Sequence, residues 1–158
     1  MIGTDIKNQL VETILKMTNF MELDCQVAVS EETDDKNLRT ALVSIYTPEN
    51  ARFLIGKNGQ NLKSLEQVLR AMFLKKIEGI NSIAVDVNDY KKSRASYLID
   101  LARQAVTRVR GTQKAEALIP MASHERRIVH MELASYPDIA TESIGAEPQR
   151  RIVIKPYP

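Results

Sequence analysis

The first 50 residues show one helical and two alternating apolar patterns. Apolar residues spaced by three and four fall on one side of a predicted helix over 4–19: Ile6, Leu10, Ile14 and Met17. Thr4 or Asp5 is the expected N-cap of this helix. Residues 25–32 and 38–47 alternate, and the acidic turn between them predicts a β-hairpin.

The pattern of the next 40 residues predicts two helices and a strand. A short helix ends at Ile55, and a longer helix begins near Gln60 and runs towards Gly79. The expected buried stripe of the longer helix is Leu62, Leu65, Leu69, Met72 and Phe73. Residues 82–89 then read as a strand.

A second unit is predicted after Asp89. Its expected elements are a long helix over 90–110, a short strand over 115–119, a helix over 123–134 and a hairpin of 139–144 with 150–155. Gly111 is expected to end the first of these helices and Ser123 to cap the second. The fold class predicted is therefore α+β, with domains at 1–89 and 90–158.

Composition narrows the class of protein. The 158 residues are 44% hydrophobic and 27% charged, which is typical of a globular protein. No apolar run approaches the roughly 20 residues of a membrane span, so no membrane insertion is expected. The first ten residues lack a secretion signal, and Cys25 is the only cysteine, which together favour a cytoplasmic location.

Charge is unevenly distributed along the chain. Residues 1–50 carry 4 Lys/Arg against 9 Asp/Glu, a net −5, whereas residues 51–112 carry 12 against 5, a net +7. The basic surplus indicates a polyanionic partner, and a solvated lysine-rich helix face explains it equally well.

Within the basic segment, two glycines interrupt an otherwise helical pattern in ARFLIGKNGQNLKSL. Gly56 and Gly59 permit a tight turn, and a helix that starts just after Gly59 directs its unpaired N–H groups at the same place. Lys57 adds a positive charge and Asn58 an amide donor. We expect open backbone amides that bind a sugar–phosphate backbone, although a plain connector between helices would also use two glycines.

The elements around this turn resemble the KH domain in its prokaryotic arrangement, helix–strand–strand–helix–helix–strand, over residues 1–89. In that family a Gly-x-x-Gly loop holds about four single-stranded nucleotides by their backbone. The resemblance implies that Gly56, Lys57, Asn58 and Gly59 form the clamp. Ile55 is expected to line the groove beneath the bases, Lys63 is included among the binding residues, and Leu62 is more simply a core residue.

The second unit has its own candidate pair in SHERRIVHMEL. Arg126 and His130 are four residues apart, so on a helix they lie about 40° apart at the border of the apolar side. Arg126 can hold a phosphate by two parallel hydrogen bonds, and His130 can donate to a phosphate or stack on a base. Pairing of both side chains with backbone carbonyls is the alternative.

The helix with this pair, the long helix before it and the RRIVI strand after it resemble the small domain family named for its Arg-x3-His signature. That family binds single-stranded nucleic acid, and Arg126 and His130 match its named pair. Arg127 and Arg151 are further candidates. Because adjacent strand residues point to opposite faces, only one of Arg150 and Arg151 can join the same surface.

A KH unit followed by an Arg-x3-His unit resembles the bacterial SpoIIIJ-associated (Jag) protein family. The resemblance implies a cytoplasmic RNA-binding protein linked to cell elongation and envelope homeostasis, partnered by a second KH-domain protein or by a second copy. Many members carry an additional N-terminal domain and a charged linker, and this sequence begins at the KH unit. We therefore expect a two-site binder of single-stranded RNA, with single-stranded DNA as an alternative ligand.

No catalytic constellation is apparent, so no enzymatic activity, cofactor or metal is expected. Position 128 is Ile, which breaks the metal-binding H-E-x-x-H spacing after His124, and no G-x-S-x-G elbow occurs. The rival function is a protein–protein adaptor that dimerises through its KH-like unit and binds RNA weakly or not at all.

Overall fold

The computed structural model describes all 158 residues, which divide into two compact units, Met1–Lys91 and Lys92–Pro158. Both units combine helices with a three-stranded sheet, so the predicted α+β class is confirmed. Each unit has its own apolar core.

The first unit runs helix–strand–strand–helix–helix–strand. Its elements are α1 (Thr4–Phe20), β1 (Gln26–Thr33), β2 (Arg39–Tyr46), α2 (Ala51–Ile55), the 3-10 turn η1 (Lys57–Gly59), α3 (Gln60–Phe73), the 3-10 turn η2 (Leu74–Lys76) and β3 (Ser82–Val87). The sheet order is β1-β2-β3, with β1 antiparallel and β3 parallel to β2. The parallel pairing of β2 and β3 follows from the crossover through α2 and α3.

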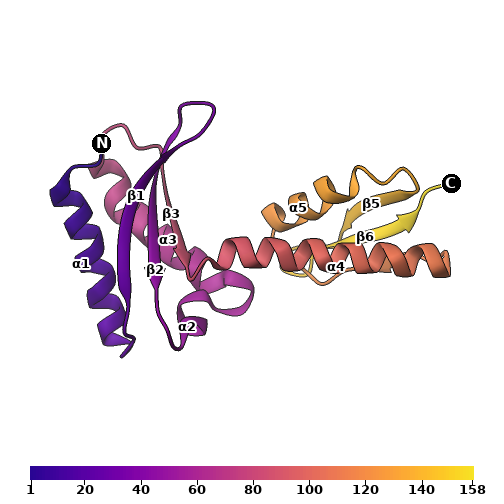
Figure 1. Cartoon of the computed structure of the whole chain (residues 1–158), viewed down its shortest axis with the longest axis horizontal. Helices are drawn as coiled ribbons and strands as arrows, with labels where there is room; N and C mark the ends of the chain where they lie inside the picture. Colours follow the sequence, from indigo (N-terminus) through magenta and orange to yellow (C-terminus); the bar gives the residue numbers. More distant parts are fainter. The chain divides into compact units, whose positions relative to one another are not determined.

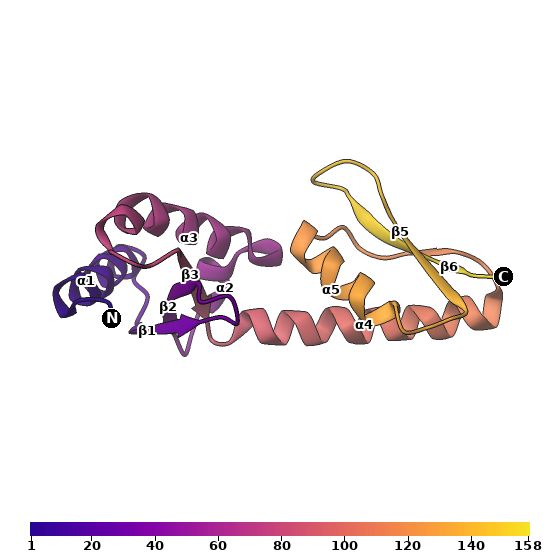
Figure 2. The same cartoon turned by 90° about the horizontal axis from the view of Figure 1, so that it is seen from above.

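The first core lies between α1, α3 and one face of this sheet (Figures 1 and 2). Leu10 and Ile14 of α1 and Leu69 of α3 are fully buried there, against alternate residues of β2 and β3 such as Val43 and Val85. The helical and alternating apolar patterns therefore describe real buried faces.

Two expectations for the first unit are wrong in detail. The residue before α1 is Gly3, and no side chain caps the helix, so neither Thr4 nor Asp5 is the N-cap. Met72 is 44% exposed and lies outside the buried stripe of α3, whereas Leu62, Leu69 and Phe73 are buried.

The second unit contains α4 (Tyr90–Thr112, shared at its start with the first unit), β4 (Glu116–Ala117), α5 (Ser123–Leu133), β5 (Ile139–Ile144) and β6 (Arg151–Pro156). The sheet order is β4-β6-β5, all antiparallel, and α4 and α5 supply the helical side of its core. Figure 2 shows α5 and the β5–β6 hairpin alongside α4.

The helix ends of the second unit differ from the prediction. Helix α4 continues through Gly111, and it ends at Gln113, which has a positive φ of 56° and whose side chain donates to the Arg110 carbonyl at 2.8 Å. The N-cap of α5 is Ala122, so Ser123 is already helical. Glu125 satisfies this end instead, because its carboxylate accepts from the Ala122 amide at 3.0 Å.

Candidate nucleic-acid interface

The Gly-Lys-Asn-Gly segment forms a tight turn between α2 and α3. Gly56 and Gly59 have φ values of 71° and 79°, and Asn58 is also left-handed with φ 53° and ψ 28°. Asn is among the few non-glycine residues that adopt this conformation readily. The predicted break in the helix, and the start of the next helix at Gln60, are confirmed.

Neighbouring side chains fix this turn from both ends. The Asn61 side chain donates from Nδ2 to the Phe53 carbonyl at 2.8 Å, and a Cβ on Gly56 would lie 2.5 Å from its Cγ. A Cβ on Gly59 would lie 3.0 Å from the Tyr90 ring. Both glycines are therefore required by backbone conformation and by close approach.

Only part of the turn presents free amides. The Gly56 N–H donates to Arg52 at 2.8 Å, the Gly59 N–H donates to Gly56 at 3.3 Å, and the Gln60 N–H donates to Lys57. The amides of Lys57 and Asn58 donate to no backbone carbonyl, and both residues are exposed. The expectation of open amides is thus correct for the two central residues and wrong for the two glycines.

The predicted neighbours of the turn have different surroundings. Ile55 is half-buried against the first core, and Leu62 is buried within it, as favoured for Leu62 from the sequence. Lys63 is exposed and lies one turn before Glu66 on the same side of α3. Glu66 accepts from the Val85 amide at 3.0 Å, so Lys63 lies on the flank of α3 that faces β3.

The basic charge of residues 51–112 is largely neutralised within the fold. The basic residues of α4 pair with acids mostly from residues 113–158: Arg94 with Glu125, Arg103 with Glu132, Arg108 with Glu116, Arg110 with Asp138, and Lys91 with Glu66. Most of the surplus on α4 is therefore structural. Lys57 and Lys63 form no ion pair, so unpaired positive charge remains beside the turn.

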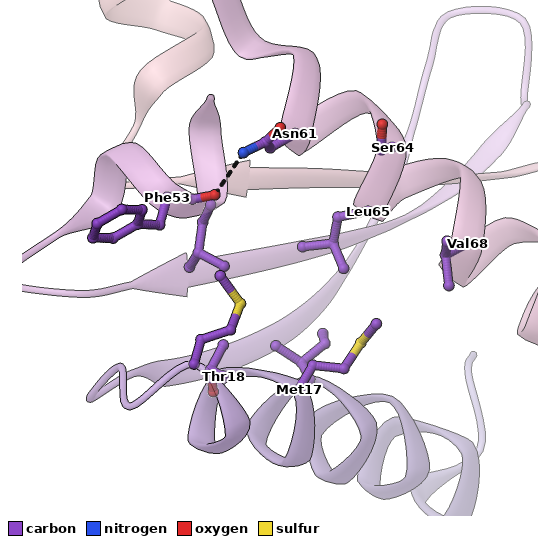
Figure 3. Close-up of a pocket in the computed structure, with 10 residues that line it drawn as sticks. Met17, Thr18, Phe53, Asn61, Ser64, Leu65 and Val68 are labelled. Atoms are coloured by element: carbon purple, nitrogen blue, oxygen red, sulfur yellow. Dashed lines mark hydrogen bonds between the residues drawn. The ribbon is translucent and has the colours of Figure 1, made fainter. Parts of the chain in front are cut away.

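An apolar groove runs between α1 and the α2–α3 pair (Figure 3), and we call it the α1–α3 groove. It has a volume of about 290 Å³, and its lining residues are Ile14, Met17, Thr18, Met21, Phe53, Leu54, Asn61, Ser64, Leu65 and Val68. Figure 3 shows Leu65 and Val68 of α3 on one side and Met17 of α1 on the other. Sequence reasoning missed this groove, although Phe53 and Val68 are apolar residues outside the predicted buried stripe.

In the second unit, Arg126 is buried and already bonded. Its Nη1 donates to the Met121 carbonyl at 2.7 Å and to Glu147 Oε1 at 2.8 Å. The Arg126 side chain is 10% exposed, whereas that of Glu147 is 57% exposed. The structure thus includes the pairing with a backbone carbonyl that the sequence left open as the alternative.

His130 and Arg127 are more accessible than Arg126. His130 is exposed, and its Nδ1 lies 2.6 Å from Thr141 Oγ1, which orients the ring and leaves Nε2 without a partner in the protein. Arg127 is exposed and forms no ion pair or side-chain hydrogen bond. Both side chains lie on the solvent side of α5.

The strand arginines lie on opposite faces, and the predicted choice between them is wrong. Thr141 and Ser143 pair in register with the buried Ile154 and Ile152, so they face the helical side of the sheet. Arg150 donates to Ser143 Oγ at 2.9 Å and lies on this side with His130. Arg151, adjacent to Ile152, points to the other face and donates to the Gln149 carbonyl at 3.1 Å.

Other classes of site find little support in the fold. No three His, Cys, Asp or Glu side chains lie close enough together to hold a metal ion. None of the helices combines the length and the apolar character that crossing a bilayer requires.

Comparison with known proteins matches residues 96–156 to the Arg-x3-His domain family, and the matched segment includes Arg126 and His130. The chain is 36% identical over 128 residues to the RNA-binding protein KhpB of Bacillus subtilis (strain 168), covering 79% of this chain and 61% of the relative. It is 34% identical over 130 residues to the protein of the same name from Lactiplantibacillus plantarum, covering 82% and 40%.

A third relative, RNA-binding protein KhpB of Clostridium symbiosum, is 26% identical over 149 residues, covering 94% of this chain and 65% of the relative. The chain therefore spans less than two thirds of the length of each of these three relatives. The matches confirm the resemblance of the second unit to the Arg-x3-His family. The chain contains an Arg-x3-His domain at residues 96–156 and is homologous to bacterial proteins named KhpB.

Proposed function

We propose that this protein binds single-stranded RNA at two sites without catalysing a reaction. The first site is the Gly56–Gly59 turn, in residues 1–89, which we assign as a KH domain of the prokaryotic type. The second is the solvent side of α5 and the adjoining sheet edge, in an Arg-x3-His domain over residues 90–158. Single-stranded DNA is the alternative ligand, to be distinguished by contacts to the 2′-hydroxyl.

The observation that carries the first site is the pair of free amides at Lys57 and Asn58. They lie at the exposed tip of a turn that Gly56 and Gly59 hold rigidly, next to the unpaired side chains of Lys57 and Lys63. Consecutive amides without side-chain obstruction form an anion-binding concavity, and nearby lysines add attraction for phosphates.

The second site rests on cations that face one side of the Arg-x3-His domain. Arg127, His130 and Arg150 lie on the helical side of the sheet, and none of them pairs with an acidic side chain. Arg126 lies beneath them and orients the site through Met121 and Glu147. Such a surface suits phosphates and a stacked base.

The relatives favour RNA as the ligand, because those compared above are all named RNA-binding proteins. The family resemblance extends the proposal to post-transcriptional regulation in the cytoplasm, linked to cell elongation and the envelope. Two weak sites on one chain would reinforce each other, because the second contact becomes intramolecular once the first has formed.

The test replaces Lys57 and Asn58 with Asp and measures binding to unstructured RNA by fluorescence anisotropy at several salt concentrations. The glycines remain, and Asp tolerates the left-handed conformation at position 58, so the turn is retained. We expect affinity to fall by about tenfold or more, because three units of charge change beside the phosphates. The wild-type log–log salt slope should be of order −2 to −4.

The first unit provides a matched control at Lys36 and Asn37. This Lys-Asn pair is also exposed, and Asn37 is left-handed with φ 58°, but both amides donate to Asp34. Lys36→Asp with Asn37→Asp makes the same charge change at a turn without free amides, and affinity should change little. Equal losses in the two double variants would reject the assignment of the Gly56–Gly59 turn.

Docking to a protein partner is a second candidate function, favoured by the α1–α3 groove. Phe53, Val68 and Met72 are each more than 40% exposed on this side, which is unusual for large apolar residues. The partner would be a second KH-domain protein or a second copy. Val68→Asp should abolish such association in sedimentation experiments and leave RNA binding unchanged. A monomer at every concentration, with no partner captured by the wild type alone, would count against this function.

A further inference from the structure

The second unit holds its buried arginine with one fixed and one exposed acceptor. Arg126 Nη1 donates at 2.7 Å to the carbonyl of Met121, a residue that is 4% exposed. The same nitrogen donates at 2.8 Å to Glu147, whose exposed side chain comes from the turn between β5 and β6. The backbone contact anchors the guanidinium, while the carboxylate is free to rotate into solvent.

A carboxylate oxygen and a phosphodiester oxygen are equivalent acceptors for such an N–H group. An RNA phosphate that approaches Arg126 therefore meets a cation whose charge is already neutralised at contact distance. The cations around it, Arg127, His130 and Arg150, have no such acidic partner. Glu147 is the acid that lowers the positive potential on this side of α5.

We infer that Glu147 is an internal competitor for the phosphate site at Arg126, an inference that rests on the proposed binding of RNA by the Arg-x3-His domain. A phosphate oxygen replaces Oε1 of Glu147 on Nη1, and the released carboxylate turns into solvent. The Met121 carbonyl keeps the guanidinium in place during the exchange. Weak ligands fail to displace the carboxylate, so Glu147 sets a threshold for binding.

The exchange has a consequence for the salt dependence of binding. When a phosphate displaces Glu147, the freed carboxylate attracts a cation from solution, which offsets one counterion released from the RNA. Without the carboxylate, that offset disappears. The log–log slope should therefore become steeper by about 0.7, the contribution of one phosphate on a single strand.

The test compares Glu147→Gln with the wild type and with Glu142→Gln, using the full chain and an unstructured RNA of about 12 nucleotides, long enough for two sites of about four nucleotides each. Glu142 is a matched control, because it is an exposed acid of the same hairpin that pairs with Lys155. It lies in register with Val153, on the sheet face opposite Thr141. Circular dichroism checks that each variant is folded.

We expect Glu147→Gln to bind about three- to tenfold more tightly, with the steeper slope, and Glu142→Gln to change neither value in that way. If the wild type binds and Glu147→Gln binds no more tightly, Glu147 orients Arg126 instead and the inference is overturned, while the proposed function stands. Equal gains in both variants would reveal a general charge effect and also overturn it. Absence of binding by all three proteins would overturn both proposals.

Discussion

The side-chain amide of Asn61 spans Gly56, donating to the Phe53 carbonyl at 2.8 Å and filling the space that a Cβ at position 56 would occupy. This contact ties the first turn of α3 to α2. The backbone turn therefore does not depend on a bound ligand for its shape, which lowers the entropic cost of binding one.

Gly56→Ala should destabilise the first unit by about 2 kcal/mol, because it combines a strained positive φ with a contact of 2.5 Å. Asn61→Ala in the same chain should restore part of that loss, since it removes the clash but leaves the strained φ. Urea denaturation of the two single variants and the double variant measures this coupling. Additive losses would show that Asn61 does not constrain Gly56.

Gly111 provides the control for a glycine without such a role. It lies inside α4, and nothing lies within 4 Å of the Cβ that alanine would add. Gly111→Ala should stabilise the protein by about 0.5–1 kcal/mol through helix propensity alone. A loss of stability at this position would mean that the helix end at Gln113 depends on the glycine.

The contrast between these glycines shows what the sequence can and cannot reveal. The two glycines of Gly-Lys-Asn-Gly flank a left-handed Asn, and their short spacing predicts a turn correctly. Gly111 follows a helical pattern in the same way, yet the chain stays helical until Gln113. One glycine at the end of a helix does not determine where it stops, because Asn, Gln and Asp also accept the left-handed conformation when a side-chain contact supports it.

Charge pairing was a second limit. The sequence shows the basic surplus of residues 51–112 but not its partners, because the acids that neutralise α4 come from elements that only the fold brings near. The arginine pair at the start of β6 was a third. The predicted strand began one residue early, at 150, and the sequence offers no test of which arginine faces the helices.

The pair formed by Arg110 and Asp138 should make stability depend on acid pH. Two hydrogen bonds from Arg110, at 2.6 and 2.8 Å, lower the pKa of Asp138 below its ordinary value of 3.8. A carboxyl group with a depressed pKa stabilises the folded state above its unfolded pKa, and this contribution disappears as the pH falls through the folded pKa. Asp138→Asn should therefore be less stable than the wild type at pH 6, and the difference should shrink below pH 3.8.

Urea midpoints of both proteins between about pH 6 and pH 2.5 measure this difference. Repeating the comparison with Arg110→Gln as the background is the control, because without the guanidinium the two proteins should respond to pH alike. A difference between wild type and Asp138→Asn that stays constant to the lowest pH would contradict the assignment of the shift to Arg110.

The two arginines at the start of β6 separate the faces of the Arg-x3-His domain by function. Arg150 bonds to Ser143 on the side of His130, whereas Arg151 points to the opposite sheet face. Arg150→Ala should weaken RNA binding by about three- to tenfold, as expected for loss of one phosphate contact, and should reduce the salt slope by about 0.7. Arg151→Ala removes the same charge one residue away and should change affinity less than twofold. Anisotropy titrations at three salt concentrations measure both values. A larger loss for Arg151→Ala would move the RNA to the open face of the β4-β6-β5 sheet, because only there does its side chain reach a ligand.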